Sequence, residues 1–482
     1  MTSLTIGQSG FGFAPTRAED RALNMRMMNR IEAIPLDSMR KGIRWDWETF
    51  PEFMDSLERQ GLGLNIAPLF PFSPMRGYVL GMMEARERTQ VTEAELNQMK
   101  QIFYEAMKAG AFGFSGNKDV NDRPEDGGFL PSHVASNEEY LALADVLGEF
   151  GVGCLGWTMG GMQDTQEAQW LLAEMIRRSG RPLTAGANST DEGLAWLAEC
   201  RAEGLPLINQ EISMNFMTRS GDGSEFTLAE YNLFDYMPNW IEPLVGSAEE
   251  RAVKLRDPRN RELMKQDVLD NPNNRNNYGT LQVVQVMHER NYQYEGMTIE
   301  ELGNAMSKHP LDAWFDLALD EDLETYFSHP FGTSEDETRE KLITNPYAHI
   351  SISDGGAHTR YLTMSSWPIH WLSHWCRDKG TVTLEQAHYK ISTLPAWIAS
   401  MKDRGMLRIG SWADIIIYNQ EELGYLYDKP IYAHDFPGGE RRLVQKPRGL
   451  LYTIVNGTVT FEDNDCTGAL PGKLLRSYDM VG

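Results

Sequence analysis

Polar and apolar positions in the first half of the chain follow a unit that recurs four times: a capping pair, an amphipathic helical run, a glycine and a short apolar strand. Each capping pair is Thr, Ser or Asp with Glu three residues later, so that two side chains satisfy free amides at the helix start. The glycine supplies the left-handed residue that ends a helix. The predicted helices span residues 92–110, 136–151, 164–180 and 189–204.

Seven apolar runs have the length of buried strands: LTIGQS, LNIAPLF, AFGFSG, VGCLGWTM, PLTAGA, LPLINQE and AHISISD. Continuous apolar runs between helices predict a parallel sheet that is covered on both faces. No GxGxxG or P-loop follows any run, which disfavours a nucleotide-binding doubly wound fold. Because a closed (β/α)8 barrel needs eight strands, we predict an α/β fold, a TIM barrel that lacks its first strand.

The second half of the chain departs from this unit. About 135 residues separate the sixth run from the seventh, which is too long for a barrel crossover. We expect a helical excursion over residues 212–345 that forms a lid or a subunit contact. After Gly410 the pattern changes to short β segments. The predicted domains are therefore a barrel, residues 1–408, and a small C-terminal β-sandwich, residues 409–482, which a missing N-terminal segment or a partner chain completes.

Composition narrows the class of protein. No apolar stretch is long enough to span a membrane, and the four cysteines lie far apart with no CxxC spacing. The net charge of −24 would repel nucleic acid and anionic lipid. We therefore expect a cytoplasmic protein that acts on a small molecule, with neither nucleic acid nor membrane as partner.

A resemblance to a known family rests on eight collinear segments between Gly7 and Arg476: GFGFAPTRAEDR, IRWDWETFPEF, GAFGFS, SGRPLT, ISDGGAH, LPAWIASMKDRGMLRIGSWADI, DFPGGERRLVQ and TIVNGTVTFEDNDCTGALPGKLLR. They resemble the N-acyl-D-amino-acid deacylase (D-aminoacylase-like) branch of the amidohydrolase superfamily. This resemblance implies a metal-dependent hydrolase of amide bonds, built as a barrel and a β-sandwich. It also implies an N-terminal segment that supplies half of the β domain and a first strand with a His-x-His metal motif.

That first strand is the point at which the chain departs from the family. The resemblance places LTIGQSG at the family's second strand, and none of the ten histidines forms an HxH pair. Either a small partner subunit carries the strand and two histidines, or the chain is a degenerate relative that closes its barrel otherwise. An open barrel exposes two strand edges, so we predict the partner subunit. A higher oligomer is also compatible with this arrangement.

The last strand ends in Asp354, and the C-terminal strand ends of such barrels carry the active site. By the resemblance, Asp354 binds metal and takes the proton from the attacking water. The glycines that follow allow a sharp turn, after which His358 returns toward the mouth as a second catalytic residue. Arg360, just beyond, is a candidate for binding a substrate carboxylate or oxygen.

Other strand ends provide supporting residues. Gln8 and Ser9 follow the first run, where the family commonly has Asn-Cys with the cysteine as a metal ligand, and neutral serine is a poor replacement. Glu211 ends the sixth run. We expect these three residues to lie around the site without binding the metal.

Aromatic and basic residues near the strands predict a substrate pocket. Phe70 ends the second run, Arg76 follows it, and Trp157 lies near the end of the fourth. We expect these three side chains to line the mouth of the barrel and to bind an apolar or ring-bearing small molecule.

Two histidines from a partner together with Asp354 would hold one divalent metal. Zinc with this set supports hydrolysis, and iron(II) with the same set is typical of oxygenases. Three hypotheses follow: the large subunit of a split amidohydrolase that cleaves an amide or related C–N bond with zinc, a mononuclear iron oxygenase on the same scaffold, or a non-catalytic scaffold subunit.

Overall fold

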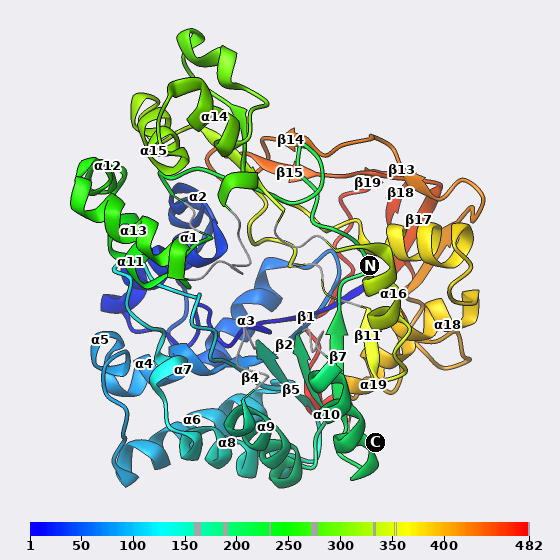
Figure 1. Cartoon of the computed structure of the whole chain (residues 1–482). Coiled ribbons are helices and arrows are strands. Elements are labelled where there is room, and N and C mark those ends of the chain that lie inside the picture. Colours follow the sequence, from blue (N-terminus) through cyan, green and yellow to red (C-terminus); the bar gives the residue numbers. More distant parts are fainter. Residues whose placement is uncertain are drawn as a thin grey trace.

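A computed structural model of the chain shows a TIM-like barrel domain followed by a C-terminal β domain (Figure 1). It describes residues 1–158, 165–186, 191–230, 233–270, 278–330, 334–350, 352 and 354–480. All seven predicted barrel strands are present. They are β1 (Ser3–Ile6), β2 (Asn65–Pro68) with β3 (Phe70–Pro71), β4 (Gly113–Asn117), β5 (Cys154–Thr158), β6 (Leu183–Gly186), β7 (Leu207–Glu211) and β11 (Ala348–Ile350).

Every pairing between these strands is parallel and follows their order along the chain. β2 pairs with β1, and β3 pairs with β4. The second predicted strand is therefore present as two short strands on either side of Leu69. In the described part of the chain, β1 pairs with β2 alone and β11 with β7 alone. The barrel thus has two strand edges, at β1 and β11, where an eighth strand would close it.

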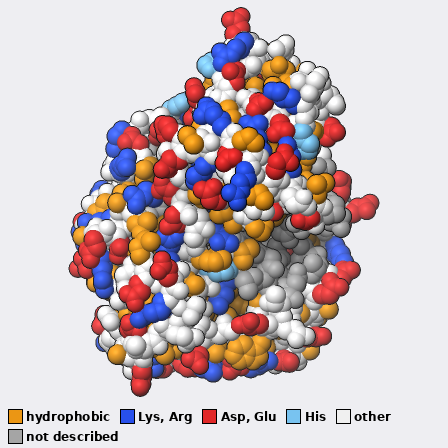
Figure 2. Space-filling view, turned by 60° about the vertical axis from the view of Figure 1, so that its left-hand side comes forward, with side chains coloured by type: hydrophobic (Ala, Val, Ile, Leu, Met, Phe, Trp, Pro, Cys, Tyr) orange, Lys and Arg blue, Asp and Glu red, His pale blue; other side chains and the backbone are white. Residues whose placement is uncertain are grey.

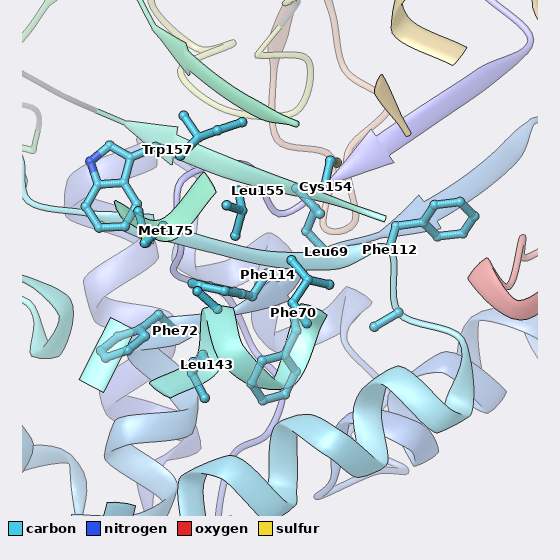
Figure 3. Packing of buried hydrophobic residues seen from close by; sticks show 14 of the residues in the cluster. Leu69, Phe70, Phe72, Phe112, Phe114, Leu143, Cys154, Leu155, Trp157 and Met175 are labelled. Carbon is cyan, nitrogen blue, oxygen red and sulfur yellow. The ribbon is translucent and has the colours of Figure 1, made fainter. Parts of the chain in front are cut away.

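The register shows which side chains point into the barrel. Ser115, Gly156 and Thr184 are in register on β4, β5 and β6, and the Gln8 side chain reaches across to donate to Thr184 Oγ1 at 3.0 Å. Because side chains alternate along a strand, the intervening residues point outward. These outward residues are Phe70, Phe114, Leu155, Trp157, Leu183 and Leu207, all buried in one apolar cluster. Figure 3 shows Phe70 and Phe72 among the strands and the helices that cover them.

Helices separate the barrel strands and cover the sheet. They are α1 (Arg21–Glu32), α2 (Leu36–Gly42), α3 (Phe50–Gln60), α4 (Phe72–Leu80), α5 (Met82–Ala85), α6 (Glu93–Ala109), α7 (Pro131–Val134), α8 (Asn137–Phe150), α9 (Gln166–Ser179) and α10 (Asp191–Ala202). The predicted capping boxes of α6 and α8 are confirmed, and each helix ends at a left-handed glycine. The α9 prediction needs a correction, because Thr165 caps it and Asp164 lies outside the described residues.

The excursion between β7 and β11 is a small α+β unit with its own core, not a purely helical one. Its antiparallel sheet has the order β8-β10-β9, and Trp240, Trp314 and Phe327 are fully buried beside it. Its elements are β8 (Ser224–Phe226), α11 (Pro238–Ile241), α12 (Ala248–Arg256), α13 (Pro258–Asp270), β9 (Gln282–Gln285), α14 (Ile299–Met306), α15 (Pro310–Asp320), β10 (Tyr326–His329) and α16 (Asp336–Ile343). Helices α12 and α14 lie within the predicted helical excursion, each with a capping box at its start.

The remaining elements complete the chain. They are α17 (Trp367–His370), α18 (Leu384–His388), α19 (Leu394–Ile398), β12 (Ile415–Tyr418), β13 (Gly424–Tyr425), β14 (Ile431–Ala433), β15 (Arg442–Val444), β16 (Pro447–Arg448), β17 (Leu450–Val455), β18 (Thr458–Glu462) and β19 (Asp465–Cys466). The β domain consists of an antiparallel sheet, β12-β17-β18-β19, and two short ladders, β13-β16 and β14-β15.

Buried polar contacts join the β domain to the barrel. The Asn65 side chain, fully buried on β2, donates to Asp414 Oδ2 at 3.2 Å and accepts from Asn456 Nδ2 at 2.8 Å. Arg404 forms an ion pair with Asp414 beside them. These contacts join β2 to side chains of the segment 404–456 through one buried polar cluster.

The surface is rich in charge of both signs. In Figure 2 acidic side chains are dispersed over the visible face among basic ones and do not gather in one patch. Within the described residues, no helix combines the length and apolar character that crossing a membrane would require.

Arg76 provides a test of the buried layer, because it forms a fully buried ion pair with Glu139 at 2.7 Å. We expect Arg76→Ala to lower the free energy of unfolding by about 3–5 kcal/mol, since Glu139 would be left buried without its counter-charge. Urea denaturation measures this. Arg59→Ala, which removes the exposed ion pair with Asp46, is the control and should change little. Equal effects of the two substitutions would contradict the assignment.

Candidate metal centre

Glu32, Asp354 and His358 converge above the barrel. Their ligand atoms lie within 4.8 Å of one another. His358 Nε2 is 3.3 Å from Glu32 Oε2 and 3.6 Å from Asp354 Oδ2. The side chains of Glu32 and His358 are 11% and 18% exposed, whereas that of Asp354 is 41% exposed. The cluster thus has a buried side and a side open to a ligand.

Backbone conformation brings these residues together. Glu32 is the last residue of α1, and Ala33 ends the helix in the left-handed region at φ 52°. The His358 amide donates to the Glu32 carbonyl at 2.5 Å, which ties the end of α1 to the loop after β11. Asp354 and His358 also have positive φ, 45° and 54°, an unusual conformation for residues other than glycine. Such residues concentrate at functional sites.

A third carboxylate adds to the negative charge. Asp122, in the loop after β4, accepts a hydrogen bond from Asn117 at the end of that strand. Burial, and then the charges of Asp354 and Asp122, hold the pKa of Glu32 well above its ordinary value. Burial and the neighbouring Asp119 raise the pKa of Asp122 to about 8. Carboxylates that raise one another's pKa in a desolvated site are stabilised by a bound cation.

The donor set fits a divalent metal. One imidazole nitrogen and carboxylate oxygens are ordinary ligands of zinc. Glu32 Oε2 is buried and accepts no hydrogen bond within the described residues, so this oxygen remains available as a ligand. Burial also lowers the pKa of His358, which favours the neutral imidazole that binds metals. Glu32, Asp354 and His358 are therefore the residues of the described chain that could hold the ion.

The structure brings together two of the residues predicted for catalysis, Asp354 and His358. Of the predicted surrounding residues, Gln8 spans the barrel interior to Thr184, and Ser9 accepts a hydrogen bond from Thr158 Oγ1 at 3.2 Å. Both therefore belong to the inner polar layer of the barrel.

Glu211 lies elsewhere, and its predicted position is corrected. It is in register with Ile350 of β11, on the outward face, whereas its neighbour Gln210 is in register with His349. Burial raises the pKa of Glu211 to about 7, and the charges that oppose this shift are Arg339 and Lys390 in the outer layer. Because successive side chains of a strand point to opposite faces, the Glu211 carboxylate points away from the mouth, whereas the Gln210 side chain points inward.

Arg360 is close to the centre in sequence, but its guanidinium is engaged. It forms an ion pair with Glu230, which also accepts from the Tyr361 hydroxyl at 3.2 Å. The predicted contact with a substrate carboxylate would require Arg360 to exchange this partner.

Three residues predicted to bind substrate are corrected by their positions. Phe70 is fully buried against Phe50 and Phe103, and Trp157 packs against Tyr140 of α8. Arg76 is fully buried with its Glu139 partner. Phe70 and Trp157 lie on the helix side of the strands, because strand residues at this parity point outward, and Arg76 lies within α4 itself.

Glu32 and Asp122 were missed by the sequence reasoning. Neither belongs to a recognisable motif, and both are far from Asp354 in the chain, Glu32 at the end of α1 and Asp122 in the loop after β4. One signal was present for Glu32. An acidic residue at the C-terminal end of a helix opposes the helix dipole, so it needs another reason to be there.

Comparisons with known proteins agree with this architecture. Residues 268–461 match the model of a family described as the amidohydrolase family. An uncharacterized protein of Mycobacterium tuberculosis is 23% identical over 516 residues, which cover 97% of this chain and 79% of that protein. N-acyl-D-glutamate deacylase of Alcaligenes xylosoxydans xylosoxydans is 28% identical over 107 residues, 22% of this chain and 19% of the deacylase.

Solved structures show the same fold. A D-aminoacylase crystal structure superposes with a TM-score of 0.59 at 16% identity and covers 98% of this chain and 82% of its own. N-acyl-D-glutamate deacylase from Bordetella bronchiseptica, complexed with zinc and a phosphonate inhibitor, superposes with a TM-score of 0.59 at 18% identity, over 99% and 82% of the two chains. The predicted resemblance and fold class are confirmed.

The carboxylates predict a pH dependence of stability. Asp122 has a pKa of about 8 in the folded protein, against about 3.9 when unfolded. Between these values the folded state holds a proton that the unfolded state has released, so stability falls as the pH rises. With a chelator present, we expect Asp122→Asn to raise the free energy of unfolding at pH 8 by up to about 5 kcal/mol and to leave it nearly unchanged at about pH 4.

Urea denaturation at the two pH values measures this difference. Asp145→Asn, which alters an exposed carboxylate, is the matched control and should show no such dependence. A gain from Asp122→Asn that is equal at both pH values would contradict the raised pKa.

Proposed function

We propose that this chain, which resembles the D-aminoacylase branch of the amidohydrolase superfamily, is a metal-dependent hydrolase that cleaves an amide or related C–N bond of a small molecule. The observation that carries the proposal is the convergence of Glu32, Asp354 and His358. Glu32 ends α1 in the connection after β1, and Asp354 and His358 lie in the loop after β11. Both connections follow the C-terminal ends of strands, where barrels of this type hold their active sites.

The metal in this proposal is a single divalent ion, with zinc the first choice. The chain offers one imidazole and carboxylates, which suits zinc, and the similar N-acyl-D-glutamate deacylase was crystallised with zinc. A similar D-aminoacylase is known to have a binuclear metal centre, with one-metal activation and second-metal attenuation. A bound zinc ion would lower the pKa of a water molecule and polarise the substrate carbonyl.

Each of the three residues of the centre has its own role in the proposed reaction. The Glu32 carboxylate is buried, and its Oε2 accepts no hydrogen bond within the described residues. This oxygen would bind the metal, and the negative charge of Glu32 would balance the positive charge of the ion. Asp354 is the most exposed of the three and is placed to accept the proton of the attacking water. His358, 3.6 Å from Asp354 Oδ2, binds through a neutral imidazole and holds the aspartate in place.

The substrate class that we propose is an N-acylated D-amino acid or a close analogue. The support is that the similar structures are a D-aminoacylase and an N-acyl-D-glutamate deacylase, and that they superpose on almost the whole of this chain. The four cysteines are free thiols, which fits the cytoplasmic location proposed for this activity. The oxygenase and scaffold alternatives gain no support from the comparisons.

We further propose that a partner polypeptide supplies the eighth barrel strand and two histidines. The support is the pair of strand edges at β1 and β11, which within the described residues each have one neighbour. Unpaired edges are costly and prone to association, and a parallel strand would satisfy both. A strand in this place would end beside Asp354 and complete the set of metal ligands.

The metal proposal predicts a linked loss of zinc and activity. We expect Asp354→Asn and Glu32→Gln to weaken zinc binding at least about tenfold. Each should also lower kcat/KM for N-acetyl-D-amino acids by about 10²–10⁴-fold. Zinc titration and release of the free amino acid, measured without oxygen on protein from the native host, test this.

Asp145→Asn serves as the surface control and should match the wild type in both assays. Undiminished zinc affinity in both centre variants would contradict the proposed ligands. Activity that required oxygen would instead favour the oxygenase alternative.

The partner proposal predicts protection of two strand edges. In protein isolated from its native host with all co-purifying chains, we expect slow backbone hydrogen exchange at both β1 and β11, together with a second polypeptide that carries an HxH sequence. The chain produced alone should exchange faster at these two strands and equally at β5, which has neighbours on both sides. Fast exchange at β1 and β11 in the native preparation would contradict an inserted strand.

A further inference from the structure

Two arginines lie over the same pair of tyrosine rings beside the barrel mouth. The Arg441 guanidinium is 4.9 Å from the ring centre of Tyr326 and 4.5 Å from that of Tyr432. The Arg219 guanidinium is 5.7 Å and 4.5 Å from the same rings. Cation–π contacts offset part of the cost of placing each charge there, but two like charges on one platform repel.

The two arginines differ in their other partners. Arg219 donates to Gln285 Oε1 at 3.0 Å and lies 3.5 Å from a carboxylate oxygen of Glu225. The Arg441 guanidinium has neither a hydrogen bond nor an ion pair to any described residue, and its contacts are the two rings. Burial, and then the charge of Arg219, lower its pKa. No Arg441 nitrogen is among the buried atoms without a partner, so its donors face solvent, where a ligand can reach them.

Nearby carboxylates do not form an ion pair with Arg441 in the described structure. Glu230 is engaged by Arg360, and Glu225 accepts hydrogen bonds from Ser220 as well as pairing with Arg219. Glu324, the third acidic neighbour, is exposed and forms no ion pair within 4 Å in the described structure. The donors of Arg441 therefore remain available to a ligand.

The β14–β15 hairpin places this pair next to the metal centre. The Leu443 amide donates to the Thr359 carbonyl at 2.6 Å, one residue beyond His358. At the tip, Ser38 Oγ of α2 donates to the Pro437 carbonyl at 2.9 Å. The hairpin thus runs from the loop that carries His358 to the helix that follows Glu32, and Arg441 lies at the start of its returning strand.

We propose that Arg219 and Arg441 form an oxyanion-binding site that takes a carboxylate or phosphate group of a small molecule at the edge of the mouth. The planar donors of arginine suit such groups, and both side chains are accessible, with Arg219 29% exposed. An anion between them would relieve the repulsion of the two charges. This site is separate from the metal centre, so anion binding there can be tested independently of the proposed hydrolysis.

The test is calorimetric titration with inorganic phosphate in the presence of a chelator, so that phosphate cannot bind to a metal ion. We expect saturable binding by the wild type that weakens with added salt. Arg441→Gln and Arg219→Gln should each lower the affinity at least about tenfold, and Arg441→Lys should lose less because it keeps the charge. Arg448→Gln, an exposed arginine of the same β domain, is the control and should bind as the wild type does.

Two results would overturn the proposal: no saturable phosphate binding by the wild type, or equal affinity in Arg441→Gln at an unchanged melting temperature. Competition distinguishes the source of the anion. Displacement of phosphate by N-acetyl-D-glutamate would assign the site to the carboxylate of an organic ligand, and failure to displace it would assign the site to a free oxyanion. Both of these competition results are consistent with an oxyanion site at Arg219 and Arg441.

Discussion

The barrel mouth is organised by mutual repulsion among desolvated carboxylates. Asp354 raises the pKa of both Glu32 and Asp122, and Asp122 also raises that of Glu32; the described residues place one imidazole, His358, among them. A fold with this arrangement loses stability unless protons or a cation neutralise it. The left-handed backbone at Asp354 and His358 shows that the surrounding structure also bears local strain to hold the cluster. The proposed chemistry follows from this constraint.

The barrel supplies the constraint through parity and strand order. Apolar residues on the outward positions pack under the helices, as Phe70 and Trp157 do, and leave a polar interior that includes Gln8 and Thr184. Loops after the strands then carry the acidic groups to one end. The β14–β15 hairpin braces this end from the β domain, and the Asn65–Asp414 contact fixes that domain to the base of β2. Stability of the outer layers thereby supports the geometry of the centre.

Much of the fold could be predicted from the sequence because its signals are local. Continuous apolar runs gave the seven strands, and the Thr92 and Ser136 capping boxes gave helix starts. Asp354 was predicted because it ends the seventh apolar run. Trp157 was placed at the mouth instead of under α8, since a buried strand of continuous apolar residues does not reveal which face is inward. Glu32 depends on a contact between segments distant in sequence, which no local pattern encodes.

The central claim is that a divalent metal binds between Glu32, Asp354 and His358. Anomalous diffraction at the zinc absorption edge, from crystals of the protein equilibrated with zinc, tests it most directly. The account predicts a strong peak within bonding distance of Glu32 Oε2, His358 Nε2 and an oxygen of Asp354, about 2.0–2.2 Å from each. A fully ordered centre with no peak at these atoms, or a peak bound by other side chains alone, would contradict it.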